Sequence, residues 1–433
     1  MARINASTMV RQFKHSFDEA RLNELGKLAR FCQRERVVTP HRLAMTMIEA
    51  FAGGALSSIA DVQRTFNALC EQPVQYKPFH NQLAKRQFPT FMRLLLSRLM
   101  NELAVQVLRF GPHSPFAGFR YIRLQDGTSF ALKDELAEHF PGRFTTISPA
   151  AVELHVNLDL LSETMHAVTL SADCQAERQF LPPAGEMAQD LLLADRGYFD
   201  KDLCRQIDLV QGSFIVRGQV NLNPLVLCAY DDHGRPIKSW RDQRLKDLRG
   251  KLLRRSVVDL DVRFDSRQGP IDCRIIANPN PREGQPRYLV SNLPRETFTP
   301  EKISDGYRLR WQIELMFKEW KSFTNLKGYC TRNPAIAEGL IWASLCAAAL
   351  SRYCAHMTQR LVRVPISTRR VAMCMRHVLT PIVYAIVRAP CTLSAAIRDA
   401  IDFLAANARR AHPAREAKSG RLKLGLQHVY GAP

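Results

Sequence analysis

The chain has 433 residues, enough for two or three domains that each bury a core of their own. It carries 61 Lys and Arg against 41 Asp and Glu, a formal net charge of +20, which favours a polyanionic partner over a basic protein without one. Its eleven cysteines include no CxxC and no Cys/His cluster with zinc spacing, which argues against a disulfide scaffold or a zinc module.

The apolar segments predict no membrane association. The first ten residues have no apolar stretch behind their arginine, so they do not resemble a secretory signal. The longest uncharged helical run, Gly339 to Ser351, is shorter than the ~20 residues that a bilayer requires. We therefore expect a soluble protein of the cytoplasm.

Residues 1–115 are predicted to be a helical DNA-binding region. Two helical stretches, 57–70 and 77–88, are separated by a short break, which is compatible with a helix-turn-helix. Lys85 and Arg86 in the second stretch are the candidate DNA contacts. Helix pairs of this kind are common in proteins that bind no DNA, so a packing role is the alternative.

Past this region the hydrophobic pattern becomes that of strands. Residues 119–124 are predicted to form a short strand, and Asp126 follows it at a turn, exposed to solvent. Residues 151–161 and 164–172 alternate in polarity and predict a hairpin around Ser162 and Glu163.

An apolar strand at 191–194 then ends directly before a second acidic residue, Asp195. A helix-like stretch at 174–190 is predicted before this strand, and a helix beginning near Asp200 and a strand at 212–218 complete the order β–β–β–α–β–α–β. This is the order expected of an RNase H-like domain with a mixed sheet, with an aspartate leaving its first and its fourth strand.

A β-rich insertion is predicted at about 219–290, where Pro/Gly/Asn-rich turns join further strands. The run 238–255 within it holds eight cations against two acids and contains Trp240. Such a run is usually a solvated face. Beside a nuclease site it would serve as a clamp on the DNA backbone.

Residues 307–321 predict about four turns of continuous helix, because the stretch has no Pro or Gly. At ~100° per residue, Tyr307, Arg310, Glu314 and Lys321 share one face. The opposite face is an apolar stripe that suits burial. The polar face is either solvated or a site in which a carboxylate lies among cations and a phenol.

From 331 to 433 the chain is predicted to be helical again. Its first helix carries small and apolar residues on several faces, so it packs against the preceding domain or against a second protomer. The basic segment 408–425 is predicted to be a tail.

The four polar residues of the 307–321 stretch match a known signature. Tyr307, Arg310, Glu314 and Lys321 have the spacing of the YREK motif, and the chain thereby resembles the DDE transposases of bacterial insertion sequences, of the insertion-sequence-four type. The segments DGTS at Asp126 and ADRGYF around Asp195 are similar to the two aspartate motifs of that family.

The resemblance covers about residues 119–325 and implies an RNase H-like catalytic domain at 116–330, with the β-rich insertion inside it and helical regions on both sides. It also implies that Asp126, Asp195 and Glu314 are the catalytic residues. These three carboxylates would hold two Mg²⁺ ions, with Mn²⁺ able to replace them.

The implied reaction is cleavage and strand transfer at the ends of an insertion sequence. Its partners would be double-stranded DNA, namely terminal inverted repeats and target DNA, and a second copy of the chain in a synaptic complex at the bacterial nucleoid. Tyr307, Arg310 and Lys321 would contact this DNA. Trp240 is a candidate platform for an unstacked base, and Trp311 is a weaker one.

Two alternatives remain at this stage. One is a structure-selective nuclease on the same core. The other is a domesticated DNA-binding protein with an inactive core, against which the intact acidic trio speaks. Asp159, Asp173 and Asp200 lie near the same elements, and we expect them to be turn or cap residues instead of ligands.

Overall fold

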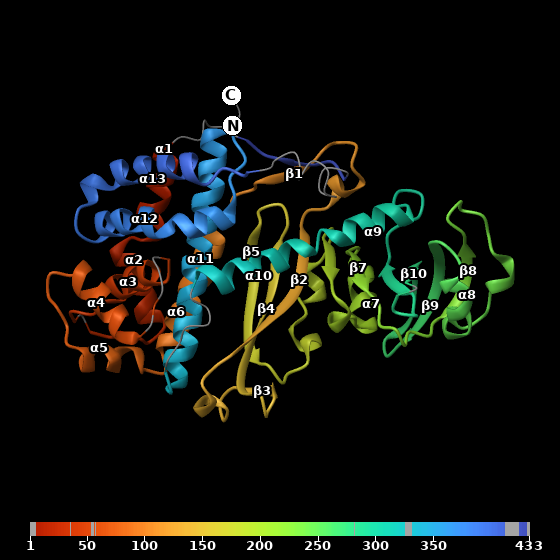
Figure 1. Cartoon of the computed structure of the whole chain (residues 1–433), viewed down its shortest axis with the longest axis horizontal. Helices are drawn as coiled ribbons and strands as arrows, with labels where there is room; N and C mark the ends of the chain where they lie inside the picture. Colours follow the sequence, from red (N-terminus) through yellow and green to blue (C-terminus); the bar gives the residue numbers. More distant parts are fainter. Residues whose placement is uncertain are drawn as a thin grey trace.

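The computed structural model describes residues 6–34, 36–52, 56, 58–280, 282–324, 331–411 and 424–430. A bundle of helices forms one half of the molecule, and one long sheet forms the other half (Figure 1). Most of the basic tail predicted at 408–425 lies outside the described residues.

Most of the helices precede or follow the sheet in the chain, whereas α7 and α8 lie between its strands. The helices are α1 (Ala6–Ser16), α2 (Glu19–Leu28), α3 (Pro40–Ala52), α4 (Ile59–Leu69), α5 (Tyr76–Leu83), α6 (Phe88–Glu102), α7 (Lys201–Leu209), α8 (Arg249–Leu253), α9 (Pro300–Arg308), α10 (Trp311–Phe323), α11 (Pro334–Val362), α12 (Thr368–Val387) and α13 (Leu393–Asn407).

Ten strands form the long sheet, in the order β3-β4-β2-β6-β7-β11-β10-β9-β8, with β5 paired to β4. The strands are β1 (Leu108–Phe110), β2 (Ile122–Ala131), β3 (Pro141–Phe144), β4 (Ser148–Asp159), β5 (Thr164–Ala172), β6 (Leu191–Ala194), β7 (Ser213–Arg217), β8 (Leu225–Tyr230), β9 (Val258–Ser266), β10 (Gly269–Asn278), β11 (Arg287–Ser291) and β12 (Leu426–His428). β1 and β12 pair with each other.

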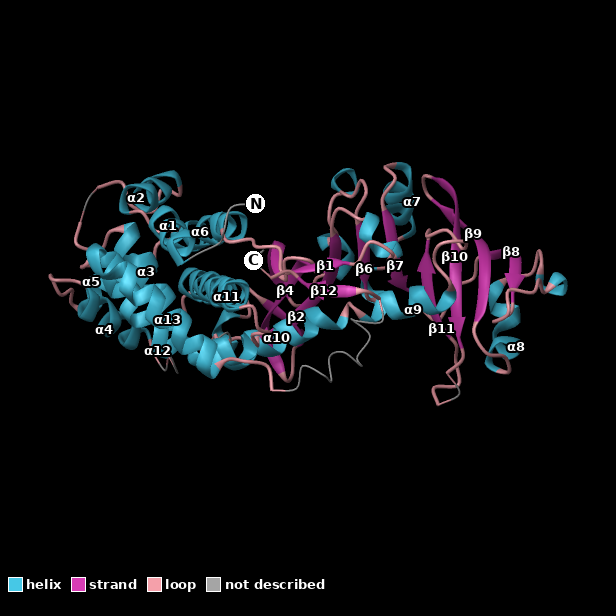
Figure 2. Cartoon of the chain, turned by 90° about the horizontal axis from the view of Figure 1, so that it is seen from above, coloured by secondary structure: helices cyan, strands magenta, loops and turns pink. Residues whose placement is uncertain are grey.

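Five strands of this sheet have the arrangement of an RNase H-like core. β4 pairs antiparallel with β5 and with β2, whereas β2, β6 and β7 are mutually parallel neighbours. Parallel strands need crossover connections, and α7 supplies the one between β6 and β7. α7 lies on one face of the sheet, and α9 and α10 lie on the other (Figure 2). The predicted α/β class, with a mixed-sheet core and helical flanks, is confirmed.

The β-rich insertion extends the same sheet. β11 pairs antiparallel with β7, and β10, β9 and β8 follow in turn. The hydrophobic side chains of this part form a second core, separate from the one shared by the helices and β2. The insertion between Asp195 and Glu314 therefore lengthens the catalytic sheet.

The helices from the two ends of the chain pack together around α11 (Figure 1). The approach of α11 to α6 is close, because a Cβ placed on Gly339 would lie 2.2 Å from the ring of Phe88. The predicted regions 1–115 and 331–433 thus share one hydrophobic core. The boundaries drawn between the three regions remain a prediction.

The length of α11 corrects the expectation that no helix could span a bilayer. It continues past the uncharged run through Arg352 to Val362. Among the described residues, α11 and α12 are long and apolar enough to cross a membrane by length and composition alone. However, 78% of the apolar window of α11 is buried inside the protein, as in a core helix.

The predicted continuous helix at 307–321 is interrupted. α9 ends at Arg308, and α10 begins at Trp311. Around the junction the backbone hydrogen bonds run from the amide of residue i to the carbonyl of residue i−3, for example from Arg310 to Tyr307. This tightening leaves the apolar stripe intact, since Ile313 and Met316 are fully buried as predicted.

Candidate active site

Asp126 lies inside a strand and not at a turn after one, as had been expected, because β2 runs unbroken through it. The neighbouring β6 is shorter and ends at Ala194, which pairs in parallel with Gln125. Asp195 is therefore the first residue to leave the sheet beside Asp126. A short strand next to a long one brings the two aspartates together.

The junction of α9 and α10 places three side chains over these aspartates. Nη1 of Arg310 donates a hydrogen bond to Oδ2 of Asp126 at 2.5 Å, and Nη2 donates to Oε1 of Glu314 at 2.7 Å. The hydroxyl of Tyr307 donates to Oδ1 of Asp195 at 3.1 Å. The structure thus brings together the three carboxylates and two of the three accompanying residues that the sequence indicated.

Asp126 sits in an environment that disfavours its charge. Burial, with added repulsion from Asp195 and Glu314, raises the pKa of Asp126 to about 6, although the Arg310 guanidinium and the Gly127 amide oppose the shift. Three hard oxygen donors that repel each other are suited to a divalent cation. Among the described residues no group of three His, Cys, Asp or Glu is close enough to hold a metal, and the guanidinium of Arg310 bridges Asp126 and Glu314.

Lys321, the fourth residue of the Tyr-Arg-Glu-Lys signature, lies in the last turn of α10. Nζ of Lys321 donates to the backbone carbonyl of Ser129 at 2.9 Å, so it lies along β2 beyond Asp126. The sequence reasoning missed Arg217, whose Nη1 is 3.8 Å from Oδ1 of Asp195. Its position at the end of β7, the strand next to β6, is the signal that would have found it.

A cluster of buried polar side chains from β4 and from the segment after β6 lies next to Gly127 of β2. A Cβ on Gly127 would come within 2.3 Å of Glu153 Oε1 and 3.0 Å of the Tyr198 hydroxyl, so the glycine after Asp126 makes room for this cluster. His155 bonds to that hydroxyl at 3.0 Å. Burial, followed by repulsion from Glu177, raises the pKa of Glu153 to about 7.

Replacing Glu153 by Gln should therefore change how stability depends on pH. A carboxyl whose pKa is higher in the folded than in the unfolded protein stabilises folding below the unfolded value and loses this contribution as pH rises through the folded value. Between pH 4.5 and pH 7 the variant should gain up to about 3 kcal/mol relative to wild type. Chemical denaturation at several pH values measures this difference.

Glu296→Gln is the matched control, because Glu296 is exposed and replaced in the same way. Its stability should follow that of wild type across the range. A difference between Glu153→Gln and wild type that stays constant with pH would contradict the assignment.

Asp200 and Asp159 have the cap and turn contacts expected of them, whereas Asp173 bonds to a neighbouring strand. Asp200 accepts from the amide of Leu203 and caps α7. Asp159 accepts from the amide and hydroxyl of Ser162 in the turn after β4. Asp173 accepts from the hydroxyl of Ser129.

The placement of Trp240 contradicts its expected role as a base platform. Its ring is 3% exposed in the core of the insertion, with the Arg255 guanidinium 5.2 Å from its centroid. A ring covered in this way has no free face for a base. Lys85 is also engaged internally, since its Nζ donates to the carbonyl of Phe31 and lies over that ring, whereas Arg86 is exposed.

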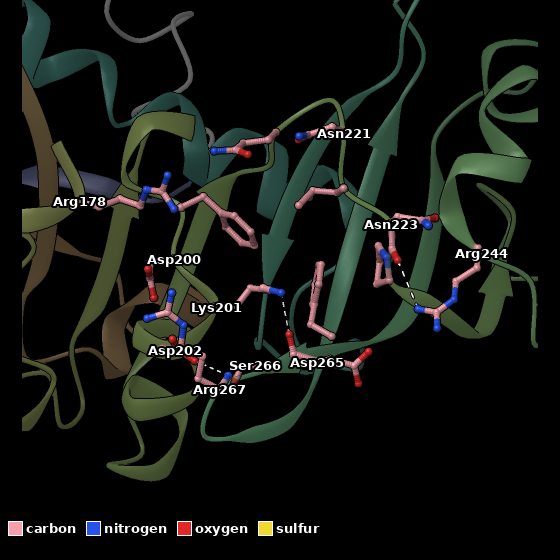
Figure 3. Close-up of a pocket in the computed structure, with 15 residues that line it drawn as sticks. Arg178, Asp200, Lys201, Asp202, Asn221, Asn223, Arg244, Asp265, Ser266 and Arg267 are labelled. Carbon is pink, nitrogen blue, oxygen red and sulfur yellow. Dashed lines mark hydrogen bonds between the residues drawn. The ribbon is translucent and has the colours of Figure 1, made fainter. Parts of the chain in front are cut away.

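A polar hollow lies at the start of α7, where Asp200, Lys201 and Asp202 line it (Figure 3). It measures about 720 Å³ and lies between the start of α7, the turn between β9 and β10, and the loop after β7. Arg178, Arg244 and Arg267 line it together with Asn221. A smaller hollow of about 460 Å³ shares Asn221 and is lined by Arg196, the residue after Asp195. The two hollows therefore meet at Asn221, and the larger one also contains Asp200, Asp202 and Asp265.

Comparison with known proteins identifies the family. A model described as Transposase DDE domain matches residues 117–350. The chain is 19% identical over 354 residues to the transposase of insertion sequence element IS1151 of Clostridium perfringens, covering 72% of this chain and 73% of that protein. It is 44% identical over 62 residues to the putative transposase InsL of IS186A of Escherichia coli strain K12, which is 14% of this chain and 17% of that protein.

Among solved structures, a piggyBac transposase in a synaptic complex with hairpin DNA is similar to 93% of this chain and 85% of its own, at 10% identity and a TM-score of 0.44. A score this low supports no conclusion about the present protein. The family match spans more than half of the chain and contains all three carboxylates. This protein therefore belongs to the DDE transposases, enzymes that act on DNA with the help of divalent metal ions.

Proposed function

We propose that Asp126, Asp195 and Glu314 are the metal ligands of this transposase and that the ions are two Mg²⁺, with Mn²⁺ as a substitute. The observation that carries the proposal is the convergence of the three carboxylates on Arg310 and Tyr307 from β2, β6 and α10. Mg²⁺ held by these three carboxylates would lower the pKa of the attacking hydroxyl and stabilise the leaving oxygen of a phosphodiester.

The neighbouring side chains hold and orient the DNA. Arg310 is a bidentate donor whose planar guanidinium suits a phosphate as well as two carboxylates. Lys321 brings a second cation to the same strip of β2. The Tyr307 hydroxyl stays protonated, because burial and next the charge of Asp195 raise its pKa, so it serves as a donor and not as a base.

The substrate we propose is the double-stranded terminal repeat of an insertion sequence, and then target DNA, in the cytoplasm at the bacterial nucleoid. The nucleophile is first water and then the freed 3′-hydroxyl. A homodimer would pair the two ends. Arginine and amide side chains line the two hollows, among them Asn221 and Arg244 in the larger one (Figure 3), and they would contact the DNA backbone along the insertion.

The test is to incubate the purified full chain and MgCl₂ with paired DNA fragments that carry the inverted repeats flanking its own gene. Cleavage at the repeat boundary followed by joining to a second DNA supports the proposal. Cleavage without joining would instead indicate a structure-selective nuclease. Binding without either reaction would indicate a DNA-binding protein with an inactive core.

Lys321→Ala should weaken binding to end DNA and reduce the slope of log K against log[salt] by about one, as expected for one lost phosphate contact. Binding of labelled duplex over a range of salt concentrations measures the slope.

Arg308→Ala is the matched control. Arg308 is an exposed cation on α9 that pairs with Asp305. Its removal should leave the salt slope unchanged, and an equal fall in both variants would rule out a specific role for Lys321.

A further inference from the structure

α12 and its C-cap present one exposed face that is basic from end to end. On a wheel of ~100° per residue, the exposed residues fall within a sector of about 140°, and the buried residues lie outside it. The helix contains no Asp and no Glu. The side chains of the basic face include Arg369, Arg370, Met373, Arg376, Tyr384 and Arg388.

Most of these arginines have no acidic partner. Arg370 donates to a backbone carbonyl, and Arg376 donates to the ring of a neighbouring histidine. Arg388 pairs with Glu71 at 3.3 Å, but among the described residues no carboxylate forms an ion pair with Arg369, Arg370 or Arg376. A row of cations that no carboxylate neutralises attracts a polyanion.

The helix beside α12 does not neutralise this face either. The ring centroids of His377 and Phe403 are 5.7 Å apart, so α13 borders the basic face. The exposed charges of α13 are Arg398, Asp399 and Asp402. Together, α12 with its C-cap and α13 expose five arginines against two aspartates.

The two ends of α12 connect the catalytic half of the molecule with the N-terminal helices. At its start, the guanidinium of Arg369 lies 5.9 Å from the ring centroid of Phe323, the last residue of α10. At its end, Arg388 reaches Glu71, which lies in the break between α4 and α5. Figure 2 shows α12 between α10 and this helix pair. The basic face therefore leads from the helix of Glu314 to the helices predicted to bind DNA.

The length of this path corresponds to a short duplex. At 1.5 Å per residue, α12 spans ~30 Å, and ~14 Å separate Glu314 from Phe323 along α10. Base pairs follow one another at about 3.4 Å along a DNA duplex. The basic face would thus lie beside base pairs at about positions 4 to 13, counted from the phosphate at the catalytic carboxylates.

We propose that the basic face of α12 binds the backbone of the duplex that extends from the cleaved phosphate into the insertion sequence. Arg369, Arg370 and Arg376 pair with phosphates, and the hydroxyl of Tyr384 donates to a further one. The inference rests on the proposed function, because it extends the same duplex from the carboxylates toward α4 and α5. It gives the C-terminal helices a contact with DNA in addition to their packing.

The first test is the salt dependence of binding. The full-length protein is titrated, without divalent metal, with a labelled duplex of the inverted repeat that flanks its own gene. The double variant Arg370→Ala/Arg376→Ala should lower the slope of log K against log[salt] by about two, because each phosphate contact contributes about 0.9.

Two controls accompany the double alanine variant. Arg370→Lys/Arg376→Lys keeps both charges and should keep the wild-type slope. Lys27→Ala removes an exposed cation of α2, on the other side of the helical bundle (Figure 2), and should also match wild type. A slope in the double alanine variant that equals the slope of Lys27→Ala would overturn the inference.

Hydroxyl-radical footprinting locates the contact on the DNA. Wild type should protect the backbone at about 4 to 13 base pairs inside the cleavage boundary. The double alanine variant should lose this protection and keep the protection at the boundary itself. Protection of the inner segment that is the same in both proteins would also overturn the inference.

Further outcomes separate this inference from the proposed function. Asp126→Asn should give the wild-type footprint, since it lacks only a ligand carboxylate. Cleavage and strand transfer by wild type without protection of the inner segment would leave the proposed function standing and remove α12 from it. Protection of that segment without any cleavage in MgCl₂ would support the DNA contact of α12 and contradict the proposed function.

The test also covers a membrane as the partner, because a basic amphipathic helix can lie on an anionic bilayer. The probe is vesicles of anionic phospholipid, added to wild type and to the double alanine variant. Loss of vesicle binding in the variant, with an unchanged salt slope on DNA, would assign the basic face to a membrane and overturn the inference.

Discussion

Asp126→Asn, Asp195→Asn and Glu314→Gln should each reduce DNA cleavage by at least about 100-fold while leaving binding to end DNA largely intact. Each change keeps the shape of the side chain and removes the negative charge that a divalent cation needs. Asp126 and Glu314 pair with Arg310, and Asp195 accepts from the neighbouring Tyr307, so loss of any one would leave an incomplete ligand set. The measurements are the single-turnover cleavage rate in MgCl₂ and the affinity for labelled duplex.

Asp200→Asn provides the matched control. Asp200 follows the same strand as Asp195 but caps α7, a role that asparagine fills about as well. Its cleavage rate should stay within a few-fold of wild type. If Asp195→Asn cuts as fast as this control, Asp195 is not a ligand, and the same criterion applies to the other two carboxylates.

Arg310→Ala should lower the free energy of unfolding of the metal-free protein by roughly 2–4 kcal/mol, between the values for a surface pair and a fully buried pair. The Arg310 side chain is 12% exposed and bridges Asp126 and Glu314, so its removal leaves neighbouring carboxylates uncompensated. The deficit should shrink in saturating MgCl₂, because the carboxylates then bind the cation and this binding favours the folded state. Denaturation with and without MgCl₂ measures both effects.

Met316→Ala separates this electrostatic effect from a general weakening of α10. Met316 is fully buried on the opposite face, and the change should cost about 2–5 kcal/mol as a large-to-small core substitution. That cost should be the same with and without MgCl₂. If the stability lost in Met316→Ala depended on MgCl₂, or the stability lost in Arg310→Ala did not, the assignment of Met316 to the core and of Arg310 to the metal site would be wrong.

Local patterns were sufficient for much of the site. The hydrophobic stripe of α10 placed Met316 in the core and Glu314 opposite it, because the turn of a helix sets which residues share a face. The apolar run of β6 located Asp195, because a buried strand in a parallel sheet leaves the sheet where its apolar residues end. The reading of Asp126 as a turn residue was wrong, because the polar residues of β2 face a buried polar cluster that no pattern within the strand reveals.

The sequence by itself predicted the class of fold and a β-rich insertion, since these depend on periodicity and on the residues of each segment, and its resemblance to the DDE transposases indicated Asp126, Asp195 and Glu314. Only the tertiary structure decided that the insertion lengthens the catalytic sheet through β11 and β7, and that helices from both ends share one core around α11. It alone showed that Trp240 is buried and Trp311 exposed. The physical reason is that burial depends on which distant surfaces meet, and an aromatic residue in a basic run has the same local pattern whether it faces solvent or a neighbouring strand.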